Sequence, residues 1–453
     1  MLSDQNNDRP TRFRWTVFGL ACGTSWMLYL HRYIFALIKP DLIDEFGLTK
    51  TELGMLDSGF AIFYSSCQVP MGIAVDAVGV QLILTLMIVV WCVGLGLHAW
   101  APNKEDLWYG RAVLGAGQSG VFAALSRVTR NWFPDHIRTT AQGWIGVFSG
   151  RIGGMSANLL VGSVIIGVYQ IPWRTAVYGL SAAGIVYAVV FALLYRNTPR
   201  QHAFVNDAEA DLIEANLYAK GVDTPRIGSR ATVVSRSVDQ SMTIREMFAR
   251  MSPRSIRNLL TLNVQTILST VADNIFSAWI PLFLVEVHDP GFKVMAILAA
   301  VPLLGGACGG VLGGWLNDLM IRRTGSLRWS RTSIGMAGKG LASVLLVTSL
   351  IWYDAPYIFC TFLFFVKFFS DWSLTTTWGA VTDIGGRTTA TVFAFNNSVA
   401  TIGAILAPVL YGAVADHFSW RVVFLTGAAA YALCALTWLA IDCRIPVITE
   451  SDE

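Results

Sequence analysis

Charged side chains are scarce in this chain. Asp, Glu, Lys and Arg make up 14% of its 453 residues, whereas hydrophobic types make up 54%. A water-soluble domain of this length covers its surface with polar groups, so the composition excludes one. The net charge of +3 is small, which excludes a strongly basic nucleic-acid-binding surface. The sequence therefore predicts a protein that lies within a lipid bilayer.

Patterns typical of metal sites, disulfide frameworks and enzymes are also missing. The seven cysteines lie almost entirely in apolar stretches, without the CxxC spacing of a metal site. No HExxH, GxSxG or P-loop motif occurs. We therefore expect no catalytic site, no metal and no cofactor, and we interpret the cysteines as packing residues.

Apolar stretches long enough to cross about 30 Å of hydrocarbon recur about twelve times. They lie near residues 15–38, 52–75, 81–101, 106–128, 139–168, 173–196, 256–285, 292–317, 331–353, 356–380, 389–415 and 419–442. A polar segment separates the first six from the last six. We predict an N-terminal six-helix bundle (1–196), a linker (197–255) and a C-terminal six-helix bundle (256–453). Apolar residues at helical spacing in 206–221 predict a short interfacial helix within the linker.

The loops between these spans differ in charge. Arginines gather before the first span and in the segments 127–138, 196–257 and 322–331. If the spans alternate across the membrane, all of these segments fall on one side, and the positive-inside rule places that side in the cytoplasm. We expect a multi-pass protein of the cytoplasmic (inner) membrane with both termini and the linker in the cytoplasm. One chain of this size suffices for a complete pathway, so we expect a monomer.

The two halves resemble each other. Trp173-Arg174 opens the sixth span as Trp420-Arg421 opens the twelfth, and the loop at 71–80 is echoed by the loop at 312–331. A six-plus-six repeat is typical of a transporter whose halves rock about a site at the membrane midplane.

Several motifs occur in a characteristic order along nearly the whole chain. They are YLHR at 29–32, YSSCQVP at 64–70 with Gly72 and Asp76 after it, RAVLGAG at 111–117, WFPDHIR at 132–138, NTPRQH at 197–202, and GGWLND at 313–318 with RRTGS at 322–326. In these motifs the chain resembles the major facilitator superfamily, and within it the anion:cation symporter family of sugar-acid permeases and organic-anion transporters. The resemblance implies an all-α membrane fold of twelve helices in two pseudo-symmetric bundles. It also implies secondary transport of a small organic anion by alternating access, with H+ or Na+ as the candidate coupling ion.

Two positions depart from the pattern of the sugar-acid symporters. His31 stands where that family has an aspartate, and Gln118 stands where it has a glutamate. The resemblance implies that these two carboxylates carry protons. An amide cannot titrate, whereas an imidazole titrates near neutral pH. Proton coupling by the family's usual route is therefore in doubt, and His31 is one candidate for an altered route.

The resemblance also implies gating loops after the second and eighth spans. Their candidate residues are Gly72, Asp76, Gly314, Asp318 and Arg322. The first loop has Ala77 and Gln81 where the superfamily has basic residues. We expect the loop at 314–323 to be the intact copy.

Three arginines inside the predicted spans are candidate ligands for an anion. Arg32 and Arg111 match positions that the resemblance implies for anion binding, and Arg151 is a third candidate. A guanidinium is a planar, bidentate donor that matches a carboxylate. The alternative for Arg32 is a structural ion pair. For Arg111 it is the role in packing and coupling that arginines of this superfamily motif also have, and for Arg151 it is a position at the membrane surface.

Five further side chains are candidates for binding the rest of the substrate. They are Tyr64, Gln118, Thr377, Trp378 and Asn396. Thr377 and Trp378 end a TTTW run that resembles the segment where sugar-acid permeases bind polyhydroxylated substrate. The alternative to substrate binding for Tyr64 is a hydrogen bond to a backbone carbonyl. For the amide and hydroxyl side chains it is hydrogen bonding between helices.

Carboxylates also occur in the middle of spans in the second half. Asp273 needs a partner or a proton, so it is a candidate for ion coupling, with a salt bridge to an arginine of the first half as the alternative. Lys367 and Asp371 are four residues apart, which favours an intrahelical ion pair, although Asp371 is also a coupling candidate. Lys339 is expected near a membrane interface without a role.

Other functions are compatible with the same pattern. One is a facilitator or antiporter for a phosphorylated or cationic solute. Another is a transporter-like membrane sensor that signals through its linker.

Overall fold

The structure is a computed structural model that describes residues 9–134, 137, 141–218, 251–385 and 389–447. Both chain termini and most of the predicted linker (219–250) lie outside the described residues. The regular elements in the described ranges are helices. Those of the first half are α1 (Phe13–Phe46), α2 (Lys50–Val78), α3 (Val80–Trp100), α4 (Lys104–Gln118), α5 (Val121–Trp132), η1 (Trp144–Phe148), α7 (Ser149–Ser156), η2 (Ala157–Val168) and α8 (Trp173–Leu194).

The short helix η3 (Pro199–Gln201) and α9 (Asp207–Tyr218) form the described part of the linker. The helices of the second half are α11 (Pro253–Ala278), α12 (Ile280–His288), α13 (Phe292–Thr324), α14 (Leu327–Ser349), η4 (Leu350–Trp352), α15 (Pro356–Gly385), α16 (Thr389–His417) and α17 (Trp420–Thr437).

Not every predicted span is apolar throughout. Nine helical segments of the described chain are long and apolar enough to cross a membrane, and the bent pair α11 and α12 is a tenth. The other two predicted spans coincide with α1 and with α4 plus α5. These carry Arg32, Lys39 and Arg111, and the second of them is interrupted at Ser119-Gly120. Charged residues inside a span are rare, so they mark the two helices as functional.

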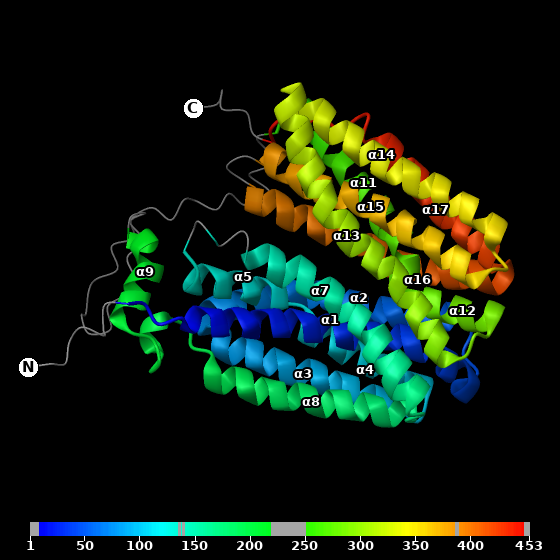
Figure 1. Cartoon of the computed structure of the whole chain (residues 1–453), viewed down its shortest axis with the longest axis horizontal. Coiled ribbons are helices and arrows are strands. Elements are labelled where there is room, and N and C mark those ends of the chain that lie inside the picture. The colour runs from blue at the N-terminus through cyan, green and yellow to red at the C-terminus, as the bar shows by residue number, and fades with distance from the viewer. Residues whose placement is uncertain (1–8, 135–136, 138–140, 219–250, 386–388, 448–453) are drawn as a thin grey trace, which may run out of the picture.

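The two halves lie side by side and are not parallel (Figure 1). They are close together at the end where α2 begins, which we call the far end, and they diverge toward the end where α9 lies, which we call the linker end. At the far end α2 packs against α16. The backbone N–H groups of Lys50 and Thr51 donate to the carboxylate of Asp416 at 3.1 and 2.8 Å, and Ser58 Oγ donates to the Ile405 carbonyl at 2.5 Å. The far end is therefore closed.

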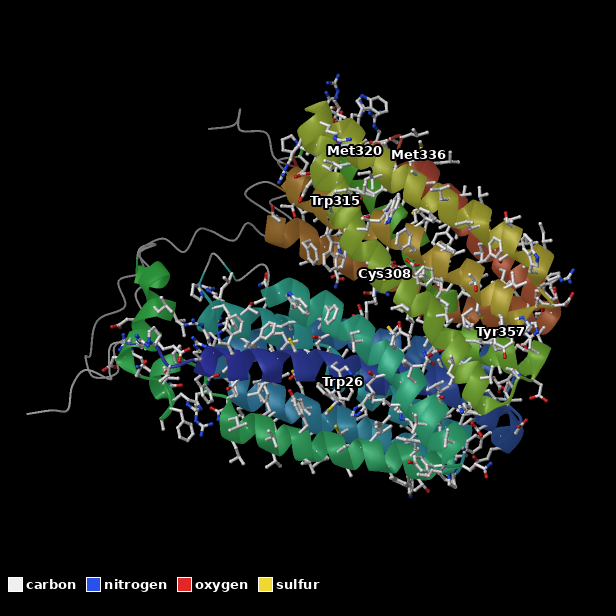
Figure 2. The ribbon with its side chains drawn as sticks, in the orientation of Figure 1. Trp26, Cys308, Trp315, Met320, Met336 and Tyr357 are labelled. Atoms are coloured by element: carbon white, nitrogen blue, oxygen red, sulfur yellow. The ribbon has the colours of Figure 1, made fainter. Side chains whose placement is uncertain are left out.

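The outer surface of the second half is apolar. Trp315, Met336 and Tyr357 are exposed on three different helices, α13, α14 and α15 (Figure 2). Such a surface suits the hydrocarbon of a bilayer.

The fifth predicted span is irregular. The π-helical turns η1 and η2 flank α7, and π turns are frequent at functional sites. Gly150 and Gly153 face Tyr29 and Trp26 of α1 so closely that a Cβ on either glycine would collide with α1. Small residues let membrane helices approach each other. They hold α7, and with it Arg151, against α1.

Candidate substrate site

A cavity of about 420 Å³ lies between the two halves. α1 and α7 line it from the first half, and α11, α13, α15 and α16 line it from the second. Its hydroxyl and amide groups include Gln265, Thr266, Ser269, Asn274, Thr377 and Asn396. Among the predicted site residues, Arg151, Asp273, Thr377, Trp378 and Asn396 line this cavity. They come from four different helices.

Five charged side chains form one continuous network, which we call the charge chain. Arg151 Nη2 lies 2.5 Å from a carboxylate oxygen of Asp371, so this pair joins the two halves. Lys367 Nζ lies 3.0 Å from Asp371 and 2.6 Å from Asp273. Lys339 Nζ ends the chain at 3.4 Å from Asp273. The chain thus contains three cations and two carboxylates, so it has one positive charge in excess.

Further hydrogen bonds fix Asp273 within the charge chain. Its Oδ1 accepts from Tyr431 Oη at 2.7 Å and from Ser370 Oγ at 3.0 Å. Ser370 Oγ also accepts from Lys339 Nζ at 2.8 Å. A buried carboxylate is stable when charge partners and donors of this kind surround it.

The structure corrects two expectations about this network. The partners of Asp273 are Lys339 and Lys367 of the second half, and not an arginine of the first. Lys339 was expected near an interface, but its side chain is fully buried inside the second half. The predicted intrahelical pair of Lys367 and Asp371 is present, and Arg151 adds a second partner to it.

Arg32 lies beside the cavity in an aromatic cage. Its guanidinium carbon is 5.3 Å from the ring centroid of Tyr29 and 5.0 Å from those of Phe60 and Tyr64. Its Nε donates to Gln118 Oε1 at 3.1 Å, whereas its buried Nη2 has no acceptor among the described residues. Cation–π contacts stabilise the guanidinium without neutralising it. Arg32 therefore keeps a full positive charge.

Tyr64 and Gln118 act through Arg32 in this arrangement. Tyr64 is not among the residues that line the cavity, and it stacks on Phe60 below the Arg32 guanidinium. Gln118 is fully buried and donates from Nε2 to the carbonyl of Leu28 at 3.1 Å. Both side chains position Arg32 and do not themselves reach the cavity.

The amino-acid sequence matches the family model of the Major Facilitator Superfamily over residues 21–383. The chain belongs to this superfamily. The probable sulfoacetate transporter of Cupriavidus necator is 26% identical to it, over 97% of this chain and 96% of the relative. The D-galactonate transporter of Escherichia coli O6:H1 is 24% identical over 96% and 97%, and the hexuronate transporter of Escherichia coli K12 is 26% identical over 97% and 96%.

A solved structure has the same fold. It is a bacterial homolog of the human lysosomal transporter Spinster in an inward-facing and occupied conformation, with a TM-score of 0.72 and 17% identity over 95% of this chain and 97% of that chain. The predicted superfamily and its all-α membrane fold are thereby confirmed.

Arg111, the second predicted anion ligand, lies away from the cavity. Its Nη2 is 2.6 Å from Asp57, and its Nε donates to the Leu56 carbonyl at 3.2 Å. Lys39 Nζ is 2.7 Å from the same Asp57 and donates to the Ala278 carbonyl of the second half at 2.8 Å. Lys39 and Asp57 were missed as functional candidates. Lys39 follows the predicted end of the first span directly and Asp57 lies near the start of the second, so the signal was that α1 continues past residue 38 and carries a charge there.

His31 is one of the predicted coupling residues. Its side chain points into the first half. It is buried on α1, and a Cβ added to Gly184 of α8 would lie 2.9 Å from its Cε1. It does not line the cavity. Asp371 is buried behind Arg151 and Lys367. Of the three coupling candidates, Asp273 is the one that lines the cavity.

The gating-loop residues lie toward the linker end of the helices. Asp76 pairs with Arg127 at 2.5 Å, and both are exposed. Asp318 and Arg322 are exposed on α13. An ion pair next to this second loop joins Arg331 of α14 to Asp383 of α15 at 3.0 Å.

The loop at 314–323 is the one expected to be the intact copy. The ion pair near it joins the two following helices, α14 and α15. Neither loop glycine is crowded, because a Cβ on Gly72 would meet its nearest neighbour at 4.0 Å and a Cβ on Gly314 would meet nothing within 4 Å.

Proposed function

We propose that this protein is a secondary transporter that moves a small organic anion, of the sugar-acid or related carboxylate class, by alternating access. The observation that carries the proposal is the excess of positive charge around the cavity. The charge chain has one cation more than it has carboxylates, and Arg32 has no carboxylate partner within the part of the chain that the structure describes. A buried charge is stable only with a counter-charge, which an anionic substrate supplies.

Arg151 is the proposed first contact of the anionic group. It lines the cavity and its side chain is 22% exposed, whereas that of Arg111 is 3% exposed. One Nη atom is occupied by Asp371, and a guanidinium has further donors for a carboxylate. Arg32 stands behind Tyr29 on the same side of the cavity and adds a second positive charge.

The remaining wall suits a polyhydroxylated molecule. Gln265, Thr377 and Asn396 offer amide and hydroxyl groups, and Asn274 has a buried Oδ1 without a donor among the described residues. The related proteins named above are transporters for sulfoacetate, D-galactonate and hexuronate, all of them small organic anions. This similarity supports the proposed substrate class.

Alternating access is proposed from the shape of the molecule. The far end is closed by direct contacts between α2 and α16, while the halves diverge at the linker end (Figure 1). The arginine-rich loops lie toward the linker end, so we place that end in the cytoplasm. The structure then corresponds to an inward-facing state in the cytoplasmic membrane.

The test is uptake by the purified protein in liposomes. We expect saturable uptake of at least one of labelled D-galactonate, glucuronate and sulfoacetate, and no uptake of glucose. Arg151→Gln should lower the apparent affinity about tenfold or more, because it removes a charge-assisted contact. Arg421→Gln is the matched control, since Arg421 is exposed at the far end and should leave uptake unchanged. Uptake of neutral or cationic solutes in preference to all three anions would contradict the proposal.

A further inference from the structure

We infer that the carrier is an anion exchanger, which returns across the membrane readily only with an anion in its cavity. The inference rests on the proposed transport of organic anions and concerns how that transport is driven. It follows from the balance of charges around the cavity and from the contacts that the two carboxylates of the charge chain already make.

Positive charge is in excess around the cavity. Within the second half, Lys339 and Lys367 balance the two carboxylates Asp273 and Asp371. Arg151 of the first half pairs with the same Asp371 and brings the network to three cations against two carboxylates.

In the first half, Lys39 and Arg111 share one carboxylate, Asp57, and Arg32 has only the neutral Gln118. Arg32 and Arg111 lie near the same ring, with guanidinium carbons 5.0 and 4.8 Å from the Phe60 centroid. Among the described residues, Asp57 is the one carboxylate that pairs with Arg111, and none pairs with Arg32.

This excess opposes movement of the empty carrier. While the linker end is open, water and dissolved anions reach the cavity and stabilise its charge. In passing to the opposite state both ends close for a time, and a charge cut off from water needs a counter-charge inside the protein. A bound carboxylate supplies it. The loaded carrier should therefore reorient much faster than the empty one.

A co-transported cation does not solve the same problem. A proton or Na+ adds to the positive charge, and both carboxylates of the charge chain already have partners. Asp273 contacts Lys339 and Lys367, and Asp371 contacts Lys367 and Arg151. The other titratable groups that face them are Tyr29 and Tyr33 on the cavity wall and Tyr431, which donates to Asp273.

Two other features of the chain could supply a cation site, His31 and a cluster of metal-binding side chains. His31 faces α8 and does not line the cavity. Within the described ranges, no three Asp, Glu, His or Cys side chains come together in a group able to hold a metal ion. The solute that fits the site as the exchange partner of the substrate is therefore a second anion.

The experiment compares two preparations of proteoliposomes that differ only in unlabelled D-galactonate on the inside. Uptake of labelled D-galactonate is measured in both preparations. The same comparison is made with labelled and unlabelled sulfoacetate, and with labelled and unlabelled glucuronate. We expect the initial rate to be about tenfold or more higher in preloaded vesicles. An inward gradient of H+ or Na+ should change the rate in empty vesicles less than about twofold.

Equal rates with and without internal anion, or uptake into empty vesicles driven by either gradient, would overturn the exchange mechanism and leave the proposed function intact. No uptake of any of the three anions in either preparation would overturn the proposed function, and the exchange mechanism with it.

Two variants test whether charge is the cause. Gln118→Glu places a carboxylate beside Arg32, and Asn397→Asp places one on the exposed α16 wall of the cavity, where folding is not at stake. Each should raise the rate in empty vesicles about fivefold or more and lower the advantage of preloading. Gln118→Met, which removes the amide without adding charge, should keep that advantage. If both acidic variants bind substrate and still need internal anion as the wild type does, the charge argument is overturned.

Discussion

Lys339 has the most enclosed charge in the second half. Its side chain is fully buried, and its ammonium contacts Asp273 at 3.4 Å and Ser370 Oγ at 2.8 Å. Asp273 shares its own charge between Lys339 and Lys367. A buried ion pair adds little net stability, but removal of one partner leaves the other charge uncompensated. The charge chain should therefore respond strongly to the loss of any one member.

We predict that Asp273→Asn destabilises the protein by about 3 kcal/mol, because Lys339 would keep only a hydroxyl as its partner. Thermal unfolding of the detergent-solubilised protein measures this as a lower Tm. The double variant Asp273→Asn with Lys339→Met should recover much of the loss, since it removes the orphaned charge as well. Equal Tm values for the single and double variants would show that the two residues are not coupled.

Sequence alone could identify the charged residues inside spans but not their directions. Arg111 and Arg151 are both mid-span arginines flanked by glycine, yet Arg111 pairs with Asp57 away from the cavity and Arg151 lines the cavity. The reason is that glycine and other small residues occur around both helices, so helical periodicity does not specify which side faces the centre. Lys339 was misplaced for the same reason.

At the scale of elements, the linker helix α9 is attached to the start of α1. Glu209 is fully buried, and its carboxylate accepts from the backbone N–H groups of Phe13 at 3.0 Å and Arg14 at 3.1 Å and from Thr11 Oγ1 at 2.6 Å. A carboxylate at a helix N-terminus satisfies free N–H groups and interacts well with the helix dipole. The described part of the linker should therefore move with the first half.

His202 makes this attachment sensitive to pH. Its ring stacks on Phe13 at 3.9 Å, and its Nδ1 accepts from the Phe204 N–H at 3.2 Å, so Nε2 carries the proton that faces the Leu194 carbonyl. Burial lowers the pKa of His202 below its ordinary value of 6.5. The attached state thus binds fewer protons than the detached state, and its stability is full above about pH 6.5 and declines as the pH falls below it.

We predict faster amide hydrogen exchange in residues 9–14 and 203–210 at pH 5 than at pH 7.5, after correction for the intrinsic rates. Protonation would set an N–H of His202 against the N–H of Phe204, which removes one hydrogen bond. His202→Phe should keep the stacking on Phe13 and abolish the difference between the two pH values. The same difference in the variant would mean that another group titrates.

The helices themselves were largely predictable, because long apolar runs bounded by polar turns leave few alternatives in a bilayer. The irregularities inside them were not. The 52° bend between α11 and α12 has a sequence signal in Pro281, which has no N–H to donate. The π turns on either side of α7 have no such signal, because they depend on how α7 packs against α1.

At the scale of the whole molecule, the repeat and the loop charges predict two bundles and their orientation, but no pattern in the sequence selects one conformational state. A transporter needs both states, so its sequence must make each of them accessible. The closed state of the far end is visible in close backbone contacts. A Cβ on Gly412 of α16 would collide with the Lys50 carbonyl oxygen, and one on Gly54 of α2 would collide with the carbonyl of Pro408. These two glycines are needed only while the far end is closed.

Gly412→Ala should therefore shift the population toward a state that is open at the far end. Overpacking against a backbone oxygen costs about 1–3 kcal/mol, and because the cost applies to one state alone, it changes the ratio of the two states about fivefold or more. Spin labels at Glu105 and Phe418, in a cysteine-free background, report the far-end separation as a distance distribution, and we expect its longer component to grow. Gly340→Ala is the matched control, since a Cβ on Gly340 of α14 meets nothing within 4 Å. An unchanged distribution in Gly412→Ala, with a folded protein, would mean that α2 and α16 do not separate during transport.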